Sequence, residues 1–122
     1  SNIIITNRTK SKAENLKGLF KEITLVDWGE IPEIDMIINA TSLGLKDEDK
    51  IELEFSKIGK NKFFYDLIYN PEETFFLKQG KKLGHKIENG KMMFIYQAYL
   101  AFKLWHGIYP KINNDIIDLL RQ

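Results

Sequence analysis

An isolated arginine follows the first apolar segment of the chain and has the clearest chemical potential in the sequence. Ile3-Ile4-Ile5 is followed by Asn7-Arg8-Thr9, and Lys12 lies one helical turn farther on. The guanidinium of Arg8 can offer two parallel N–H donors to two phosphate oxygens, and Lys12 would add a second positive charge. No acidic residue lies between Asn7 and Lys12. The segment therefore predicts a phosphate-binding loop, whereas the alternative is an ordinary exposed turn between a strand and a helix.

Two polar side chains in the second half of the chain are candidates for contact with a ligand. Gln97 lies in a long apolar helical segment, which predicts that its amide is buried and pairs with a group such as a ligand hydroxyl. It could instead lie on the polar face of that helix. Tyr69 precedes Asn70-Pro71 and is either a ligand contact or an aromatic residue of the turn. Asp66, at the end of an aromatic segment, is a candidate catalytic acid, with a structural role as the alternative.

Several classes of chemistry are not indicated. The chain has no cysteine, which excludes disulfides and thiolate zinc sites, and His85 and His106 lack suitably spaced partners for a metal. Eighteen basic and 17 acidic residues are interspersed and give a net charge of +1, unlike the one-signed stripe of a nucleic-acid-binding protein. No apolar stretch is long enough to span a membrane, and no signal peptide is visible. We expect a cytoplasmic protein without nucleic-acid, membrane or metal partners.

Alternating strands and helices must position the candidate residues. The length of 122 residues fits one domain. Apolar runs predict strands at residues 3–5, 23–26, 36–39, 63–67 and 86–88, the first and third buried on both faces. Helices are predicted at residues 11–20, with Ser11 and Glu14 as a capping box, at 72–82, at 90–106, and from Pro110 through Leu120. Residues 46–62 are expected to form a solvated connection with one helical turn. The pattern predicts an α/β fold with a mostly parallel sheet flanked by helices.

Four blocks of the sequence resemble the shikimate dehydrogenase family and occur in that family's order. They are Asn7-Arg8-Thr9 with Lys12; residues 35–45, DMIINATSLGL; residues 65–71, YDLIYNP, with Thr74 and Leu77; and residues 89–93, NGKMM, with Gln97, Ala98, Phe102, Trp105 and Gly107. The resemblance implies a Rossmann-like NADP-binding domain. Residues 1–122 would be its C-terminal portion, with C-terminal helices from about residue 90 to 121.

The resemblance also implies a role for each matched residue. Asn7, Arg8, Thr9 and Lys12 would hold the adenosine 2′-phosphate and adenine of NADP. Thr41 and Ser42 would border the cofactor, while Leu67, Gly90 and Met93 would lie at its nicotinamide end, and Tyr69 and Gln97 would contact the substrate. From the residues alone, Met93, like Met92 and Tyr96, is more typical of a protein core.

The family reduces 3-dehydroshikimate to shikimate with NADPH, a step of aromatic amino acid biosynthesis. Its glycine-rich loop, its first strand, and its catalytic lysine and aspartate motifs have no match in this chain. The resemblance thus predicts a fragment of an NADP-dependent oxidoreductase, without catalytic residues of its own and inactive without the N-terminal catalytic domain. Two alternatives are a quinate/shikimate dehydrogenase that uses NAD or NADP, and a non-catalytic α/β interaction module.

Overall fold

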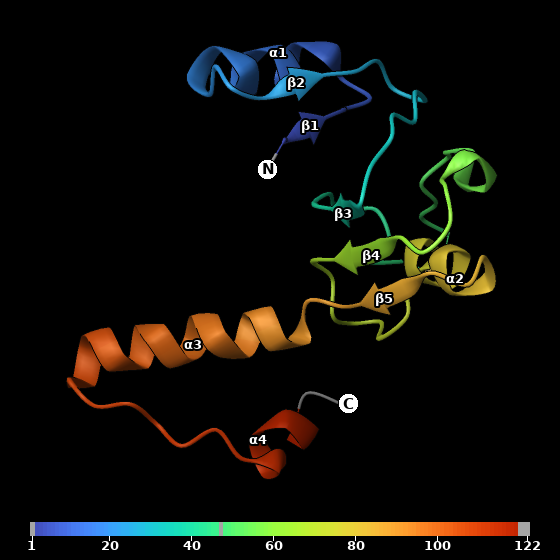
Figure 1. The fold of residues 1–122 in the computed structure, drawn as a ribbon. Coiled ribbons are helices and arrows are strands. Elements are labelled where there is room, and N and C mark those ends of the chain that lie inside the picture. Colours follow the sequence, from blue (N-terminus) through green and yellow to red (C-terminus); the bar gives the residue numbers. More distant parts are fainter. Residues whose placement is uncertain (1, 47, 120–122) are drawn as a thin grey trace. The chain divides into compact units, whose positions relative to one another are not determined.

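The computed structural model describes residues 2–46 and 48–119. The elements follow in the order β1 (Ile4–Ile5), α1 (Lys10–Leu19), β2 (Thr24–Leu25), β3 (Met36–Asn39), a 3₁₀ turn η1 (Phe55–Lys57), β4 (Phe63–Asp66), α2 (Phe75–Lys82), β5 (Lys86–Glu88), α3 (Lys91–His106) and α4 (Asn114–Leu119) (Figure 1). They form two compact units. Unit 1 contains the residues up to 33 together with 52–58, and unit 2 contains 34–51 and the residues from 59 onward.

Unit 1 is a short parallel β-α-β arrangement. β1 pairs with β2 in the register Ile4 to Thr24 and Ile5 to Leu25, and α1 connects the two strands. The buried apolar side chains of the unit come from α1, from the residue before β2 and from the returning segment around η1: Ala13, Ile23, Phe55 and Ile58. The ammonium of Lys17 donates hydrogen bonds to the carbonyl oxygens of Lys21 and Ile23. Lys17 therefore closes the turn between α1 and β2.

Unit 2 is built on a parallel sheet with the strand order β3-β4-β5. Helix α2 packs on β4 and β5. The centre of this packing is Phe64, which is fully buried and whose ring lies 5.0 Å, centre to centre, from both Phe76 and His85. A Cβ atom at Gly80 of α2 would lie only 2.7 Å from the Phe64 ring. The absence of a side chain at Gly80 thus allows α2 to approach the sheet closely.

Helix α3 follows β5 and is capped at its C-terminal end by Gly107, which adopts a left-handed conformation with φ of 73°. Glycine is favoured here because it has no Cβ to crowd the following carbonyl. The ammonium of Lys103 donates to the carbonyl oxygen of Gly107 at 3.2 Å and lies 4.4 Å from the centre of the Tyr109 ring. Tyr109 stacks on Tyr99, with 4.9 Å between ring centres. These contacts hold the segment after α3 against the end of the helix.

Most of the predicted elements are confirmed. The strands predicted at residues 36–39 and 86–88 are β3 and β5, and the long helix predicted to end at His106 is α3. Every described strand pairing is parallel. The single helical turn expected in residues 46–62 is η1, although Ile51, Phe55 and Ile58 in that connection are buried rather than solvated. The last helix is α4, but it begins at Asn114 rather than at Pro110, and Leu120 lies outside the described residues.

Three local predictions are wrong. Ser11 and Glu14 do not form a capping box, because α1 begins at Lys10 and its N-cap residue is Thr9. Helix α2 begins at Phe75 rather than at residue 72, because the hydroxyl of Thr74 caps it. The strands β1 and β3 are not buried on both faces: β1 is half-buried, and Met36 and Ile38 of β3 are exposed. Among the described strands, β3 pairs with β4 alone.

Among the described residues, none of the helices combines the length and hydrophobicity that a membrane span needs.

The close approach of α2 to the sheet predicts that alanine at Gly80 lowers stability, whereas alanine at Gly18 of α1 does not. Gly80→Ala is expected to lower the free energy of unfolding by about 1–3 kcal/mol, because the new methyl group overlaps Phe64. Gly18→Ala in α1 is the matched control, since no atom beyond its own chain neighbours and the nearby backbone of α1 lies within 4 Å of its Cβ position. It should raise stability by about 0.5–1 kcal/mol through helix propensity. Urea unfolding measures whether the free energy of unfolding falls for Gly80→Ala and rises for Gly18→Ala. Equal effects would contradict the packing described for Gly80.

Candidate functional site

The loop after β3 is held by the side chain of Asn39, the last residue of the strand. Its Oδ1 accepts hydrogen bonds from the N–H of Thr41 at 3.0 Å and from the Thr41 hydroxyl at 2.7 Å. Its Nδ2 donates to the carbonyl oxygen of Leu43 at 3.0 Å and to Oδ1 of Asp66 at 3.1 Å. Thr41 and Ser42 are left exposed at the carboxyl edge of the sheet, which is where open parallel sheets bind ligands.

Asp66 ends β4 and is fully buried, with 0% exposure. Besides Asn39, its Oδ1 accepts from the N–H of Ile68 at 3.0 Å, and its Oδ2 accepts from the hydroxyl of Thr74 at 2.6 Å. The Thr74 oxygen in turn accepts from the N–H of Leu77 and so caps α2. Both carboxylate oxygens therefore bind protein donors. These contacts support the structural interpretation of Asp66.

The start of α3 lies directly against the loop after β4. A Cβ atom at Gly90 would lie 2.0 Å from the carbonyl oxygen of Leu67, so no other residue fits without moving the backbone. The N–H of Gly90 donates to the carbonyl oxygen of Ile68 at 3.2 Å. The structure thus brings together Leu67 and Gly90, which were both expected at the nicotinamide end of the cofactor. Met93 lies one turn farther along α3 and is half-buried.

Two polar contacts join Glu72 to the start of α3, and a third holds Asn89 to the first residue of the helix. Nδ2 of Asn89 donates to the carbonyl oxygen of Glu72 at 3.0 Å, while its Oδ1 accepts from the N–H of Lys91 at 3.0 Å. Nζ of Lys91 lies 3.5 Å from Oε1 of Glu72, and Lys91 is only 8% exposed. We did not predict these roles. The asparagine immediately before the helix was the available signal, because asparagine side chains often bond to the backbone N–H groups that open a helix.

The two predicted substrate contacts have different surroundings. Tyr69 is half-buried and stacks on Phe94 of α3, with 5.0 Å between ring centres. The peptide bond between Asn70 and Pro71 is cis. Gln97, by contrast, is exposed, so the prediction that its amide is buried is wrong. The apolar neighbours that suggested burial belong to a face of α3 that is itself exposed.

The loop between β1 and α1 contains the predicted phosphate-binding residues of unit 1. Oδ1 of Asn7 accepts from the N–H of Thr9 at 2.8 Å, and the N–H of Lys12 donates to the carbonyl oxygen of Thr9 at 3.0 Å. The side chains of Arg8 and Lys12 are exposed. No side chain caps α1, and its first turn has no acidic residue. Beside this loop, the hydroxyl of Thr6 is buried and has no partner among the described residues.

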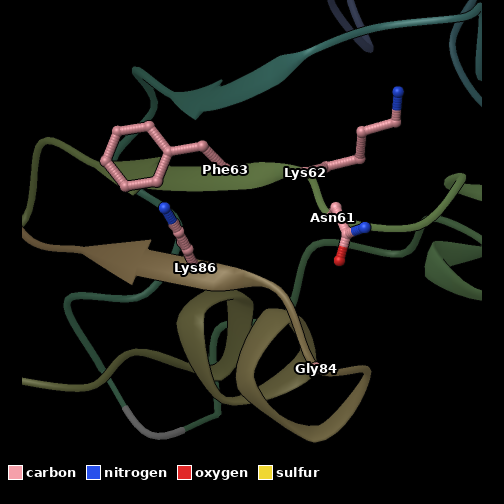
Figure 2. Close-up of a pocket in the computed structure, with 5 residues that line it drawn as sticks. All are labelled: Asn61, Lys62, Phe63, Gly84 and Lys86. Atoms are coloured by element: carbon pink, nitrogen blue, oxygen red, sulfur yellow. The ribbon is translucent and has the colours of Figure 1, made fainter.

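A separate hollow lies at the amino ends of β4 and β5 (Figure 2). It encloses about 690 Å³ and is lined by Asn61, Lys62, Phe63, Gly84 and Lys86. None of the predicted site residues lines it. Figure 2 shows the two lysine side chains pointing in different directions rather than converging on one point. We therefore place the candidate site at the carboxyl edge of the sheet, not in this hollow.

Comparisons with known proteins identify the family. No family model matches the chain. The shikimate dehydrogenase (NADP(+)) of Pelagibacter ubique is 57% identical over 118 residues, which cover 97% of this chain and 44% of that protein. The chain belongs to the shikimate dehydrogenase family. It spans less than half the length of the relatives that it matches.

Solved structures of shikimate dehydrogenases and related enzymes share the fold. Shikimate 5-dehydrogenase from Thermus thermophilus, in complex with NADP(H) and shikimate, has a TM-score of 0.83 and 29% identity. The match covers 98% of this chain and 45% of that one. Quinate dehydrogenase from Corynebacterium glutamicum, in complex with NAD, has a TM-score of 0.80 and 25% identity over 98% of this chain and 44% of its own. These matches confirm the predicted Rossmann-like fold.

The hydrogen bonds around Asp66 predict that valine substitution lowers stability much more at Thr74 than at Thr24. Thr74→Val keeps the shape of the side chain but removes both the cap of α2 and a hydrogen bond to the buried carboxylate. It should lower the free energy of unfolding by roughly 2–4 kcal/mol. Thr24→Val in β2 is the control, because its side chain is exposed, and should change stability by less than about 0.5 kcal/mol.

Urea unfolding of the two valine variants, together with Thr74→Ser, provides the measurement. The serine variant retains the hydroxyl and should recover most of the loss. An equal loss in the serine and valine variants would show that the hydroxyl of Thr74 does not stabilise the network.

Proposed function

We propose that this chain is the NADP-binding part of a shikimate dehydrogenase. The complete enzyme would reduce 3-dehydroshikimate to shikimate with NADPH, and an N-terminal catalytic domain would supply the proton donor. The observation that carries the proposal is the position of Arg8. It lies exposed in the loop that joins β1 to an α1 helix with no acidic residue in its first turn. A guanidinium and an open helix N-terminus are both favourable to a phosphate group.

Two features of the described residues fit a bound dinucleotide. The unpartnered hydroxyl of Thr6 is a buried polar group that a ligand could satisfy, and it lies two residues before Arg8. At the other candidate contact, the missing side chain of Gly90 lets the carbonyl group of Leu67 lie directly against the start of α3, so that the two residues proposed for the nicotinamide end are adjacent. When bound, NADPH supplies the hydride that reduces the ketone.

In this proposal the residues of the chain bind the cofactor and orient it and the substrate. Arg8, with Asn7, Thr9 and Lys12, would hold the adenosine 2′-phosphate and adenine. Thr41 and Ser42 would border the cofactor on the loop that Asn39 fixes, while Leu67, Gly90 and Met93 would pack at its nicotinamide end. Tyr69 would be held for substrate contact by its stacking on Phe94, and Gln97 would contact the substrate from α3.

Two other functions have specific observations in their favour. A quinate or shikimate dehydrogenase that uses NAD is supported by the similarity to the NAD complex of quinate dehydrogenase. Arg8 argues against NAD, because a carboxylate that accepts bonds from the ribose hydroxyls would suit NAD better. A non-catalytic interaction module is consistent with the absence of the catalytic motifs, and it predicts no saturable binding of NADP.

Substitution of Arg8 tests the cofactor assignment. Arg8→Ala should weaken binding of NADP by about tenfold to a hundredfold, because hydrogen bonds to a charged group are lost, and should change NAD binding by less than threefold. Lys21→Ala is the matched control, as it removes another exposed cation of unit 1. Calorimetric titration of the unchanged chain and of both variants with the two cofactors gives the six affinities. Equal losses for NADP and NAD would remove the 2′-phosphate role, and no NADP binding by the unchanged chain would favour the interaction module.

The isolated chain is expected to be catalytically inactive. With shikimate and NADP, it should give no increase in absorbance of reduced cofactor, because no proton-transfer residue is assigned to it. A full-length shikimate dehydrogenase is the positive control in the same assay. Steady formation of NADPH by the purified chain would contradict the assignment of the proton donor to a separate N-terminal domain.

A further inference from the structure

Asn89 is the only asparagine in the sequence that is followed by glycine. Because Gly90 has no Cβ, the peptide nitrogen after Asn89 is unhindered and can reach the side-chain carbon Cγ of Asn89. Attack at that carbon closes a succinimide ring, a reaction that needs no enzyme and that makes asparagine one of the thermolabile residues of proteins. The sequence therefore indicates that Asn89 is the asparagine most prone to this reaction.

The folded chain engages the atoms that must react. The N–H of Gly90, which holds the attacking nitrogen, donates to the carbonyl oxygen of Ile68 at 3.2 Å. Nδ2 of Asn89, the leaving group, donates to the carbonyl oxygen of Glu72 at 3.0 Å, and Oδ1 accepts from the N–H of Lys91 at 3.0 Å. Asn89 is half-buried and Gly90 is buried. Ring closure therefore requires these hydrogen bonds to open.

We propose that Asn89-Gly90 is a site of spontaneous deamidation whose rate is controlled by the junction between the loop after β4 and α3. When the junction opens, base removes the proton from the Gly90 nitrogen, which bonds to Cγ of Asn89 as the Cγ–Nδ2 bond breaks. Nδ2 takes a proton from water and leaves as ammonia. A water molecule then opens the ring at either carbonyl group, which gives aspartate or isoaspartate. The inference does not require the proposed function, because it concerns the chain without a ligand.

The two products affect the junction differently. Aspartate keeps the length of the backbone and an oxygen for the N–H of Lys91, but it loses the donor to the carbonyl oxygen of Glu72. Isoaspartate adds a carbon atom to the backbone directly before Gly90. The packing leaves little space there, since even a Cβ atom at Gly90 would lie 2.0 Å from the carbonyl oxygen of Leu67. Isoaspartate should therefore separate Leu67 from Gly90.

Asn15 provides an internal control for the reactivity of Asn89. Trypsin releases Asn15 in residues 13–17, AENLK, and Asn89 in residues 87–91, IENGK, so leucine and glycine after the asparagine are compared in nearly the same peptide. The chain is incubated at mildly alkaline pH in water enriched in heavy oxygen, folded or in guanidinium chloride, and mass spectrometry measures the label that ring opening incorporates.

The two conditions have different expected rates. In guanidinium chloride, Asn89 should react at least about tenfold faster than Asn15, because the leucine side chain hinders the attacking nitrogen of Asn15. In the folded chain, Asn89 should react at least about tenfold more slowly than in guanidinium chloride, because only the fraction with an open junction reacts.

Two neighbouring glutamates test whether the junction sets this rate. Glu72→Gln removes the ion pair with Lys91 of the junction, whereas Glu73→Gln removes the same charge but breaks an ion pair with Lys81 of α2. In the folded chain, Glu72→Gln should raise the rate at Asn89 by about twofold to fivefold, and Glu73→Gln by less than about 1.5-fold. In guanidinium chloride neither variant should change the rate.

The isoaspartate form, separated by chromatography, tests the effect on packing. Asn89→Asp is its matched control, because it adds the same charge without the additional backbone carbon. The isoaspartate form should unfold at a lower concentration of guanidinium chloride than Asn89→Asp.

Several results would overturn the proposal. Equal rates at Asn89 and Asn15 in guanidinium chloride would show that Gly90 does not make the site reactive. Equal rates at Asn89 in the folded and unfolded chain, or equal acceleration by Glu72→Gln and Glu73→Gln, would show that the junction does not control the reaction. An isoaspartate form as stable as Asn89→Asp would show that the added carbon does not disturb the packing at Gly90.

Discussion

The buried carboxylate of Asp66 determines how the carboxyl edge of the β3-β4-β5 sheet is organised. A charge removed from water is costly unless protein groups replace its solvation, and Asp66 has three such donors. The amide of Asn39 comes from β3, the N–H of Ile68 from the loop after β4, and the hydroxyl of Thr74 from the start of α2. Because one carboxylate satisfies all three, two loops and a helix are fixed at the edge where a ligand would bind.

The elements that local sequence determines were predicted well. β3 and β5 were predicted with their observed bounds, and α3 ends at Gly107 because glycine readily adopts the left-handed conformation found there. The carboxyl-edge position of Thr41 follows equally from local pattern, since a strand ending at Asn39 must leave the next residues at that edge. These features depend on a few neighbouring residues and therefore need no knowledge of distant parts of the chain.

The features that sequence reasoning missed depend on distant partners. The side chain of Asn89 donates a hydrogen bond to the carbonyl oxygen of Glu72, which lies 17 positions earlier, and no local pattern predicts such a pair. Burial was predicted for Gln97 and Ile38 from their apolar neighbours, but both are exposed because nothing among the described residues covers them. Apolar pattern indicates that a surface is suited to burial. It does not indicate which part of a protein, or which partner, covers that surface.

The ion pair between Lys91 and Glu72 has a practical consequence for studies of this lysine-rich chain. Acylating reagents react with amines that they can reach, whereas the amine of Lys91 is shielded beside a carboxylate. Its rate of chemical labelling would therefore follow the opening of the junction between the β4 loop and α3. Mass spectrometry of a labelled digest could thus monitor the integrity of this junction without any substitution or added probe.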